Sequence, residues 1–465
     1  MRPTPVMDFL AASSVAQASV IRGAAATAPA AEDVRPLPPV RSWPGSRRMA
    51  AWYTAFAAYA GIIAVVSGAS YERTWGYWAV AAYSAAALVS FCWRSQGRNA
   101  ALFASLTGAL AAPLTWLAAL SPPTPDVQVV SRAAALLLQH GTPYLSSAQI
   151  AHLGVPIAYN PYLPAMAVFG LPKAVGVPGA AGDPRLWLAV ATAALLALAF
   201  RLAGRGDAVR CSLFAVASPV VAFPLVLGTT DAPVLALVCV ALALLSQVSR
   251  TRLVWAAAIV VGIACGLKYT AWPALPVIAA MLAARYGARM AVRFGAVAAA
   301  TTAVLVAALD VPDLGRPAAL IQNTVLFPLG LTRAKTPAAS PLPGHLLAMQ
   351  GPTAHLVAIG LLITAGLAVA VSLVLRPPAD AAAAAWRLII GLTLMFGLSP
   401  ATRFGYFAYP IGLCGWLAMC HAAARARREP APGSPAGTAL SWPRRALALA
   451  AAQSAQVQRQ RRAAR

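Results

Sequence analysis

Long uninterrupted apolar runs are the feature that most constrains the fold of this chain. Hydrophobic residues make up 60% of its 465 residues, and charged residues only 10%. Soluble domains carry roughly 25% charged residues, so a soluble fold would lack the polar side chains to cover its surface. Many of the runs approach the ~20 residues that cross a bilayer as a helix. We therefore expect an all-α, polytopic transmembrane protein.

Twelve of these runs are candidate membrane spans. They cover residues 49–69, 75–93, 100–120, 185–203, 209–228, 231–247, 253–270, 272–284, 291–309, 353–375, 386–400 and 404–424. A further apolar stretch, 161–177, is broken by three prolines and carries Lys173. Because proline interrupts a helix, we interpret this stretch as a re-entrant or interfacial segment, with a full span as the alternative.

The basic residues indicate the orientation of the spans. With twelve spans and both termini inside, clusters such as Arg201, Arg205 and Arg210 fall in short cytoplasmic loops, as the positive-inside rule requires. Counting 161–177 as a span would move that cluster outside. The sequence thus predicts a multi-pass plasma-membrane protein whose two largest loops, 121–184 and 310–352, lie outside the cytoplasm. This distribution also accounts for the net charge of +24 and argues against nucleic-acid binding.

The predicted organisation has three parts. Residues 1–48 form a cytoplasmic extension that we expect to be disordered, 49–424 form the membrane domain, and 425–465 form a basic cytoplasmic tail near anionic lipid. No cytoplasmic loop is long enough for a nucleotide-binding domain, and the chain contains neither GxxxxGK[ST] nor GxGxxG after a strand. An activated substrate must then arrive through the membrane or from outside.

Asp126 is the leading candidate for catalysis. It follows the third predicted span and three nearby prolines, and it precedes VQVVSRAAALLLQH, which we expect to form a helix along the membrane interface. Gly141 and Pro143 should end that helix. A carboxylate fixed at the membrane surface suits a functional role. The structural alternative is that Asp126 only caps the helix N-terminus.

Three more charged residues lie at predicted outer span ends. Asp231 begins the sixth span in GTTDAP, Lys268 lies near the end of the seventh in GLKYTAWP, and Arg403 stands in TRFGYFAYP. A charge near hydrocarbon costs several kcal/mol, so its presence calls for a reason. Each also has a structural alternative, namely a helix cap for Asp231, a snorkelling side chain for Lys268 and a salt bridge or interface anchor for Arg403.

Two polar segments of the outer loops complete the set of candidates. Tyr159 and Tyr162 belong to YNPYLP, whose composition also fits an interfacial aromatic belt. Arg333, Lys335 and His345 belong to the proline-rich loop Asn323–His345. The length of that loop favours a lid or substrate-binding role over a simple connector.

These segments together resemble a known enzyme group. An acidic residue after an early span, an amphipathic helix, GTPY, YNPYLP, GTTDAP, GLKYTAWP, FPLGLTRAKTPAASPLPGH and TRFGYFAYP are similar to segments of glycosyltransferases of the GT-C fold. More narrowly, residues 50–425 resemble the actinobacterial family 87 group of polyprenyl-phosphomannose-dependent mannosyltransferases. The resemblance implies a GT-C-like membrane fold with interfacial helices in the first large outer loop.

The resemblance also implies a reaction. Asp126 would be the general base, and Lys268 and Arg403, with Arg333 or Lys335, would neutralise the phosphate of the donor. The donor would be a hexose, implied to be mannose, on polyprenyl phosphate, and the acceptor a cell-envelope glycolipid or glycan, with inversion at the sugar. Asp126 lacks the neighbouring acid that many relatives carry, so metal dependence stays open; we expect no metal and no cofactor.

Two other functions remain compatible with the sequence. A multi-spanning transporter or flippase for a lipid-linked or small amphipathic substrate is the main alternative, because several prolines interrupt the predicted helices. A membrane scaffold without catalysis is the third. Such a scaffold would tolerate loss of Asp126, whereas the enzyme would not.

Overall fold

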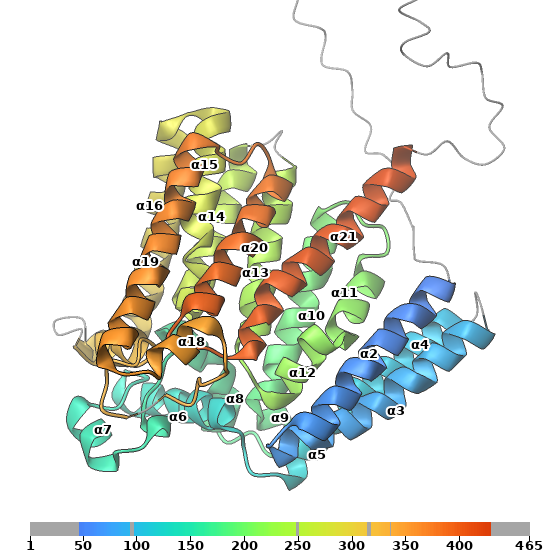
Figure 1. The fold of residues 1–465 in the computed structure, drawn as a ribbon, viewed down its shortest axis with the longest axis horizontal. Helices are drawn as coiled ribbons and strands as arrows, with labels where there is room; N and C mark the ends of the chain where they lie inside the picture. The colour runs from blue at the N-terminus through green and yellow to red at the C-terminus, as the bar shows by residue number, and fades with distance from the viewer. Residues whose placement is uncertain (1–45, 94–96, 248–250, 314–317, 335, 429–465) are drawn as a thin grey trace, which may run out of the picture. The chain divides into compact units, whose positions relative to one another are not determined.

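A computed structural model of the protein describes residues 46–93, 97–247, 251–313, 318–334 and 336–428 (Figure 1). These residues form helices and turns with no β-strand, and one isolated parallel bridge joins Ala339 to Thr402. Most of the predicted extension 1–48 and of the basic tail 425–465 lies outside the described residues. The fold is all-α, as the sequence predicts.

The first helices pack against one another through small residues. α2 (Ser46–Val66) and α3 (Ser70–Cys92) pair closely, followed by α4 (Gly97–Leu106), the π-turn η1 (Thr107–Ala111) and α5 (Ala112–Leu120), which together make one long helix. Gly76 lies against the backbone of Ala64, which lets the two helix axes approach. The Trp75 indole donates a hydrogen bond to the Ala109 carbonyl at 2.9 Å, which joins α3 to η1.

The centre of the bundle is α13 (Asp231–Ser246), in which every residue from Asp231 to Leu245 is buried. A helix that is apolar on all sides is stable only when other helices surround it. Around it lie α10 (Pro184–Leu202), α14 (Thr251–Leu267), α20 (Ala381–Leu398) and α21 (Ala408–Arg428). Next come α15 (Ala274–Tyr286), α16 (Ala288–Leu309) and α19 (Pro352–Leu375), which complete the long helices on this side (Figure 1).

One predicted span is sharply bent. α11 (Ala208–Ala217) and α12 (Pro219–Leu227) meet at 65°. Pro219 has no amide hydrogen to continue the helical bonding and begins a new helix after Ser218. The Tyr83 hydroxyl takes up the Ala217 carbonyl at this break, at 2.6 Å. The bend aims the end of α12 at the loop that leads into α13.

Short helices gather at one end of the bundle (Figure 1). The first loop forms α6 (Pro125–His140), α7 (Ser147–Leu153), η2 (Pro156–Ala158), η3 (Pro164–Gly170), α8 (Leu171–Ala174) and α9 (Gly179–Gly182). Later segments add η4 (Tyr269–Ala271), η5 (Val311–Asp313), α17 (Ala318–Ile321), η6 (Gln322–Leu326), α18 (Pro343–Ala348) and η7 (Phe404–Phe407). α6 is the helix predicted after Asp126, and it ends where expected, at Gly141 in a left-handed conformation.

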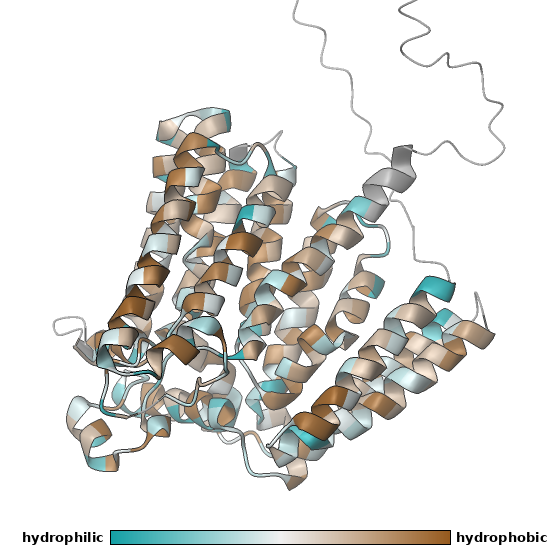
Figure 2. Cartoon of the chain, in the orientation of Figure 1, coloured by the Kyte–Doolittle hydropathy of each residue, from teal (hydrophilic) through white to brown (hydrophobic). Residues whose placement is uncertain are grey.

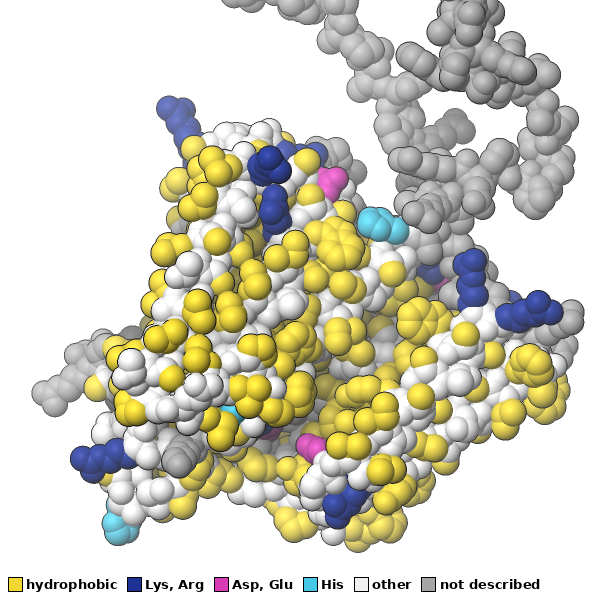
Figure 3. Space-filling model, viewed as in Figure 1, with side chains coloured by type: hydrophobic (Ala, Val, Ile, Leu, Met, Phe, Trp, Pro, Cys, Tyr) yellow, Lys and Arg dark blue, Asp and Glu magenta, His cyan; other side chains and the backbone are white. Residues whose placement is uncertain are grey.

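Each of the twelve predicted runs contains or overlaps a helix, but they differ in length. Seven helices of the described residues are long and apolar enough to cross a membrane, and the bent pair α11–α12 raises this to eight. The stretch 161–177 holds only the short η3 and α8, not one continuous helix. Apolar residues run along the long helices (Figure 2), and Lys and Arg lie mostly towards their ends (Figure 3). The protein is therefore a helical membrane protein.

The close approach of α2 and α3 leads to a first prediction. A Cβ at Gly76 would stand 2.7 Å from the Ala64 backbone nitrogen, so Gly76→Ala should separate the helices and lower the melting temperature of the purified protein in detergent. Overpacking costs typically about 1–3 kcal/mol. Gly61→Ala on α2 is the matched control, because its Cβ would meet only the Val80 methyl at 3.7 Å. Equal melting of the two variants would contradict this account.

Candidate active site

The candidate site begins at the N-terminus of α6. Thr124 is the N-cap residue in an extended conformation, and Pro125 supplies the first helical position. The Thr124 hydroxyl donates to the Leu227 carbonyl at the end of α12, at 2.6 Å. This bond ties the start of α6 to the bundle. Asp126, two residues after Thr124, is thereby held next to the end of α12.

The carboxylate of Asp126 does not cap the helix. Its Oδ1 accepts a hydrogen bond from the Tyr162 hydroxyl at 2.7 Å, and its Oδ2 lies 3.4 Å from Nη1 of Arg403. The side chain is 19% exposed, so both oxygens are oriented while one edge can still be reached from outside. The structural alternative of a helix cap for Asp126 is therefore wrong.

Tyr162 is fixed by contacts between the loop segments 121–184 and 310–352. Its amide nitrogen donates to Oδ1 of Asn160, and its carbonyl accepts from the Tyr144 hydroxyl at 2.8 Å. The amide nitrogen of Asn160 in turn donates to Oδ1 of Asn323 on η6. Burial, and next the carboxylate of Asp126, raise the pKa of Tyr162 well above its ordinary value. The phenol therefore keeps its proton and acts as the donor to Asp126.

A buried ion pair, Lys268 and Asp231, lies next to Tyr162. Nζ of Lys268 stands 2.5 Å from Oδ1 of Asp231, and both residues are nearly inaccessible. The ammonium also lies over two aromatic rings, 5.4 Å from the centroid of Tyr162 and 5.3 Å from that of Tyr406. Such contacts contribute roughly 2 kcal/mol or more when the cation is desolvated. Lys268 does not snorkel to the surface, and Asp231 makes no capping bond, since its carboxylate is engaged by Lys268.

Arg403 is positioned by the loop between α18 and the preceding η6. The Thr402 amide donates to the Ala338 carbonyl, and the Ser340 amide donates to the Thr402 carbonyl, each at 2.9 Å. Burial lowers the pKa of Arg403. The charge of Asp126, with smaller contributions from Tyr406 and Tyr162, raises it by more than burial lowers it, so the net shift is upward. The guanidinium is therefore permanently charged. With 33% of its side chain exposed, it is the most accessible cation of the site.

Five of the residues chosen from the sequence thus come together, namely Asp126, Tyr162, Asp231, Lys268 and Arg403. The others lie elsewhere. Tyr159 stacks on Phe327 at 4.3 Å in a separate buried cluster. Arg333 is exposed on the loop, and Lys335 lies outside the described residues.

His345 supports the site from behind. Its Nδ1 lies 2.7 Å from the Pro400 carbonyl, three residues before Arg403. It thereby fixes the segment that carries Arg403.

Tyr406 is a site residue that the sequence analysis did not single out. Its ring faces Lys268 and packs 5.3 Å from the ring of Phe396. The available signal was its position three residues after Arg403, which is one turn of a 3₁₀ helix. Among the described residues, no three His, Cys, Asp or Glu side chains converge as metal ligands.

Comparison of the chain with models of protein families, with curated proteins and with solved structures found no match. The class of protein is therefore described from its fold and its site. This is a helical membrane protein with an ordered polar site, containing two acids, two cations and two tyrosines, at one end of its bundle.

The contrast between the two ion pairs gives a second prediction. Lys268→Met would leave the Asp231 carboxylate buried without a partner, and breaking a buried pair typically costs about 3–5 kcal/mol. The double variant Lys268→Met/Asp231→Leu should recover much of that loss, because it removes both charges. Thermal unfolding in detergent measures both effects.

Arg403→Met is the control for this prediction, because it breaks the more exposed pair with Asp126, whose loss should cost less than that of the buried pair. If the double variant is no more stable than Lys268→Met alone, burial of an uncompensated charge is not the cause of the loss.

Proposed function

We propose that the protein is a membrane glycosyltransferase that moves a hexose from a polyprenyl-phosphate donor to an acceptor hydroxyl at the Asp126 end of the bundle. One observation carries the proposal. A partly exposed carboxylate is oriented through both oxygens, and a permanently charged guanidinium lies 3.4 Å from it. A base beside a fixed cation suits transfer of a sugar away from a phosphate leaving group.

The chemistry assigned to Asp126 is proton transfer. Its carboxylate accepts the proton of the acceptor hydroxyl as that oxygen attacks the anomeric carbon of the donor. The new C–O bond forms as the bond to the phosphate oxygen breaks, and the electron pair of that bond leaves with the phosphate. Attack opposite the leaving group inverts the anomeric centre. A positioned base contributes typically about 10²–10⁴-fold to the rate.

Arg403 is the residue assigned to the donor phosphate. It is the most exposed cation of the site, and its charge persists at any physiological pH. Lys268 has a different role from the one that the resemblance implies. Because its ammonium is buried and already paired with Asp231, it positions Tyr162 and Tyr406 and does not contact the phosphate.

The finer topology belongs to the same proposal. Twelve spans with both termini in the cytoplasm, in a GT-C-like arrangement, would place Asp126 and Arg403 on the non-cytoplasmic side. In support, loop 121–184 supplies Tyr162, and loop 310–352 supplies the segment whose backbone bonds to Thr402, the residue before Arg403. The choice of mannose and of a cell-envelope glycolipid or glycan acceptor rests on the sequence resemblance alone.

The transporter alternative has one observation in its favour. The 65° bend between α11 and α12 is a broken helix, and transporters use broken helices at substrate sites. Here the break is explained by Pro219 and leads α12 to its bond with Thr124. The charges also gather at one end of the bundle, whereas transporter sites lie near the bilayer midplane.

The third prediction tests the base. Asp126→Asn keeps the shape of the side chain and its acceptor for Tyr162 but cannot take a proton. We expect at least a 10²-fold lower rate of transfer from radiolabelled polyprenyl-phosphomannose to a mannoside acceptor by protein reconstituted in liposomes. Asp380→Asn is the control with unchanged rate, because Asp380 caps the start of α20 through the Ala383 amide.

Two results would contradict the proposal. Equal transfer by wild type and Asp126→Asn would remove Asp126 as the base. No transfer by wild type from any polyprenyl-phosphate sugar, together with lipid scrambling by both proteins, would favour the transporter.

A further inference from the structure

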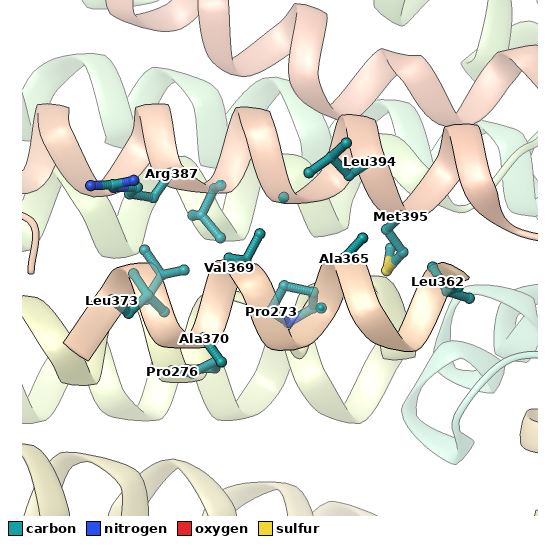
Figure 4. A pocket seen from close by; sticks show the side chains of 14 residues that line it. Pro273, Pro276, Leu362, Ala365, Val369, Ala370, Leu373, Arg387, Leu394 and Met395 are labelled. Atoms are coloured by element: carbon teal, nitrogen blue, oxygen red, sulfur yellow. The ribbon is translucent and has the colours of Figure 1, made fainter. Parts of the chain in front are cut away.

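A groove on the bundle shares no lining residue with the Asp126 site. It has a volume of about 330 Å³ and is bounded by α15, α19 and α20. Figure 4 shows Arg387 at one end, Leu362 and Met395 at the other, and Val369 and Pro273 between them. The lining is apolar over almost its whole length. Its volume is at the low end of the ~300–1,000 Å³ typical of ligand sites.

The groove exists because small residues stand where α19 faces its neighbours. A Cβ at Gly366 would meet no heavy atom within 4 Å, and one at Gly391 would meet only a Val369 methyl at 3.7 Å. α19 itself is loosely held, since Ala358 and Leu373 are its only buried residues. Because Gly366 is itself exposed, this space is open to the surface of the bundle.

The length of the groove matches one leaflet of a bilayer. Along α19 it extends from Leu362 to Leu373, twelve residues whose eleven steps of 1.5 Å span about 16 Å. The hydrocarbon core of a bilayer is about 30 Å thick, so one leaflet is about half of that. A hydrocarbon chain of one leaflet therefore fits the groove from end to end.

The charge of the groove lies at one end only. Among the described residues that line it, Arg387 is the only charged one. Its guanidinium donates to the Ser372 hydroxyl and to the Arg376 carbonyl, and these two bonds leave other N–H groups available. Arg376 is exposed beside it. The nearby Asp380 keeps its negative charge while it caps α20, so the two arginines and this acid together carry a net charge of +1. This end of the groove attracts an anion.

We propose that the groove binds an anionic phospholipid of the leaflet remote from Asp126, with one acyl chain in the groove and the phosphate on Arg387. The direction follows from α20, in which Arg387 lies near the start while Arg403 follows the end. A sugar donor with its phosphate on Arg403 would enter from the opposite end, where the lining carries no cation. The proposal needs only that the protein spans a membrane and is independent of the proposed enzymatic function.

The bound lipid completes the fold in this region. Its chain fills the space between α19 and α20 that Gly366 and Gly391 leave open, and the single negative charge of its phosphate pairs with Arg387. α19 is thereby attached to the rest of the bundle through lipid as well as through direct contact with α20.

The fourth prediction is tested by native mass spectrometry of the full-length protein released from lipid nanodiscs containing phosphatidylglycerol and phosphatidylcholine. Wild type should retain one phosphatidylglycerol in preference to phosphatidylcholine. Arg387→Gln should reduce that preference about tenfold, because it removes the charge at the headgroup. Gly366→Leu should reduce retention of both lipids, because its side chain fills the groove.

Gly360→Leu is the matched control. Gly360 lies on the same helix, a Cβ there also meets nothing within 4 Å, and it does not line the groove, so retention should be unchanged. Both glycine variants should preserve the helix, because leucine is a better helix former than glycine. Equal lipid retention by Gly366→Leu and Gly360→Leu would overturn the proposal. The proposal would also be overturned if polyprenyl phosphate displaced the phospholipid and bound Arg387→Gln as well as wild type. The groove would then be a site for the sugar donor.

Discussion

The buried pair of Lys268 and Asp231 is the interaction on which the arrangement of the site depends. It joins the end of α14 to the start of α13, the most enclosed helix of the bundle. Two charges removed from water require each other, because an unpaired one would cost several kcal/mol. The ammonium also fixes the two tyrosine rings that flank it. One of these, Tyr162, carries the hydroxyl that orients Asp126.

The loop segments around this pair are held together by hydrogen bonds between residues far apart in sequence. Thr124 reaches Leu227, Asn160 reaches Asn323, and Thr402 pairs with the backbone at Ala338. Non-helical backbone near a membrane must find partners within the protein, since the hydrocarbon offers none. The same bonds bring Asp126 and Arg403 together across 277 positions of sequence. Satisfying the backbone and building the site are thus one structural solution.

The two ends of the bundle have different physical characters. In the site at the Asp126 end, Asp231 pairs with Lys268 and Asp126 pairs with Arg403, so each of these four charges has a partner within the protein. At the other end, Arg376 is exposed and the half-buried Arg387 donates to Ser372 and to the Arg376 carbonyl, and within the described residues neither arginine forms an ion pair. Compensated charges form an ordered polar site, whereas uncompensated ones interact with the membrane or its lipids. The proposed lipid groove and the proposed enzymatic site follow from this difference.

Sequence and tertiary structure contributed different parts of this description. The apolar runs predicted an all-α membrane protein because backbone groups in hydrocarbon must bond within a helix, which is a local requirement. The sequence also located α6 and its end at Gly141, since the effects of proline and glycine on a helix depend on the local backbone. Span lengths were less certain, because a run of apolar residues does not reveal that α13 is short and fully enclosed.

The site shows the same division. The sequence singled out Asp231, Lys268 and Arg403 as charges near span ends, Asp126 as a carboxylate before an interfacial helix, and Tyr162 as part of the aromatic segment YNPYLP. Their partners could not be predicted, since pairing depends on which helix ends meet after packing. Only the tertiary structure paired Lys268 with Asp231 and Arg403 with Asp126, placed His345 behind the Arg403 segment and Tyr159 in a separate cluster, and added Tyr406. Residue type is a property of the chain, whereas distance between residues far apart in sequence is a property of the fold.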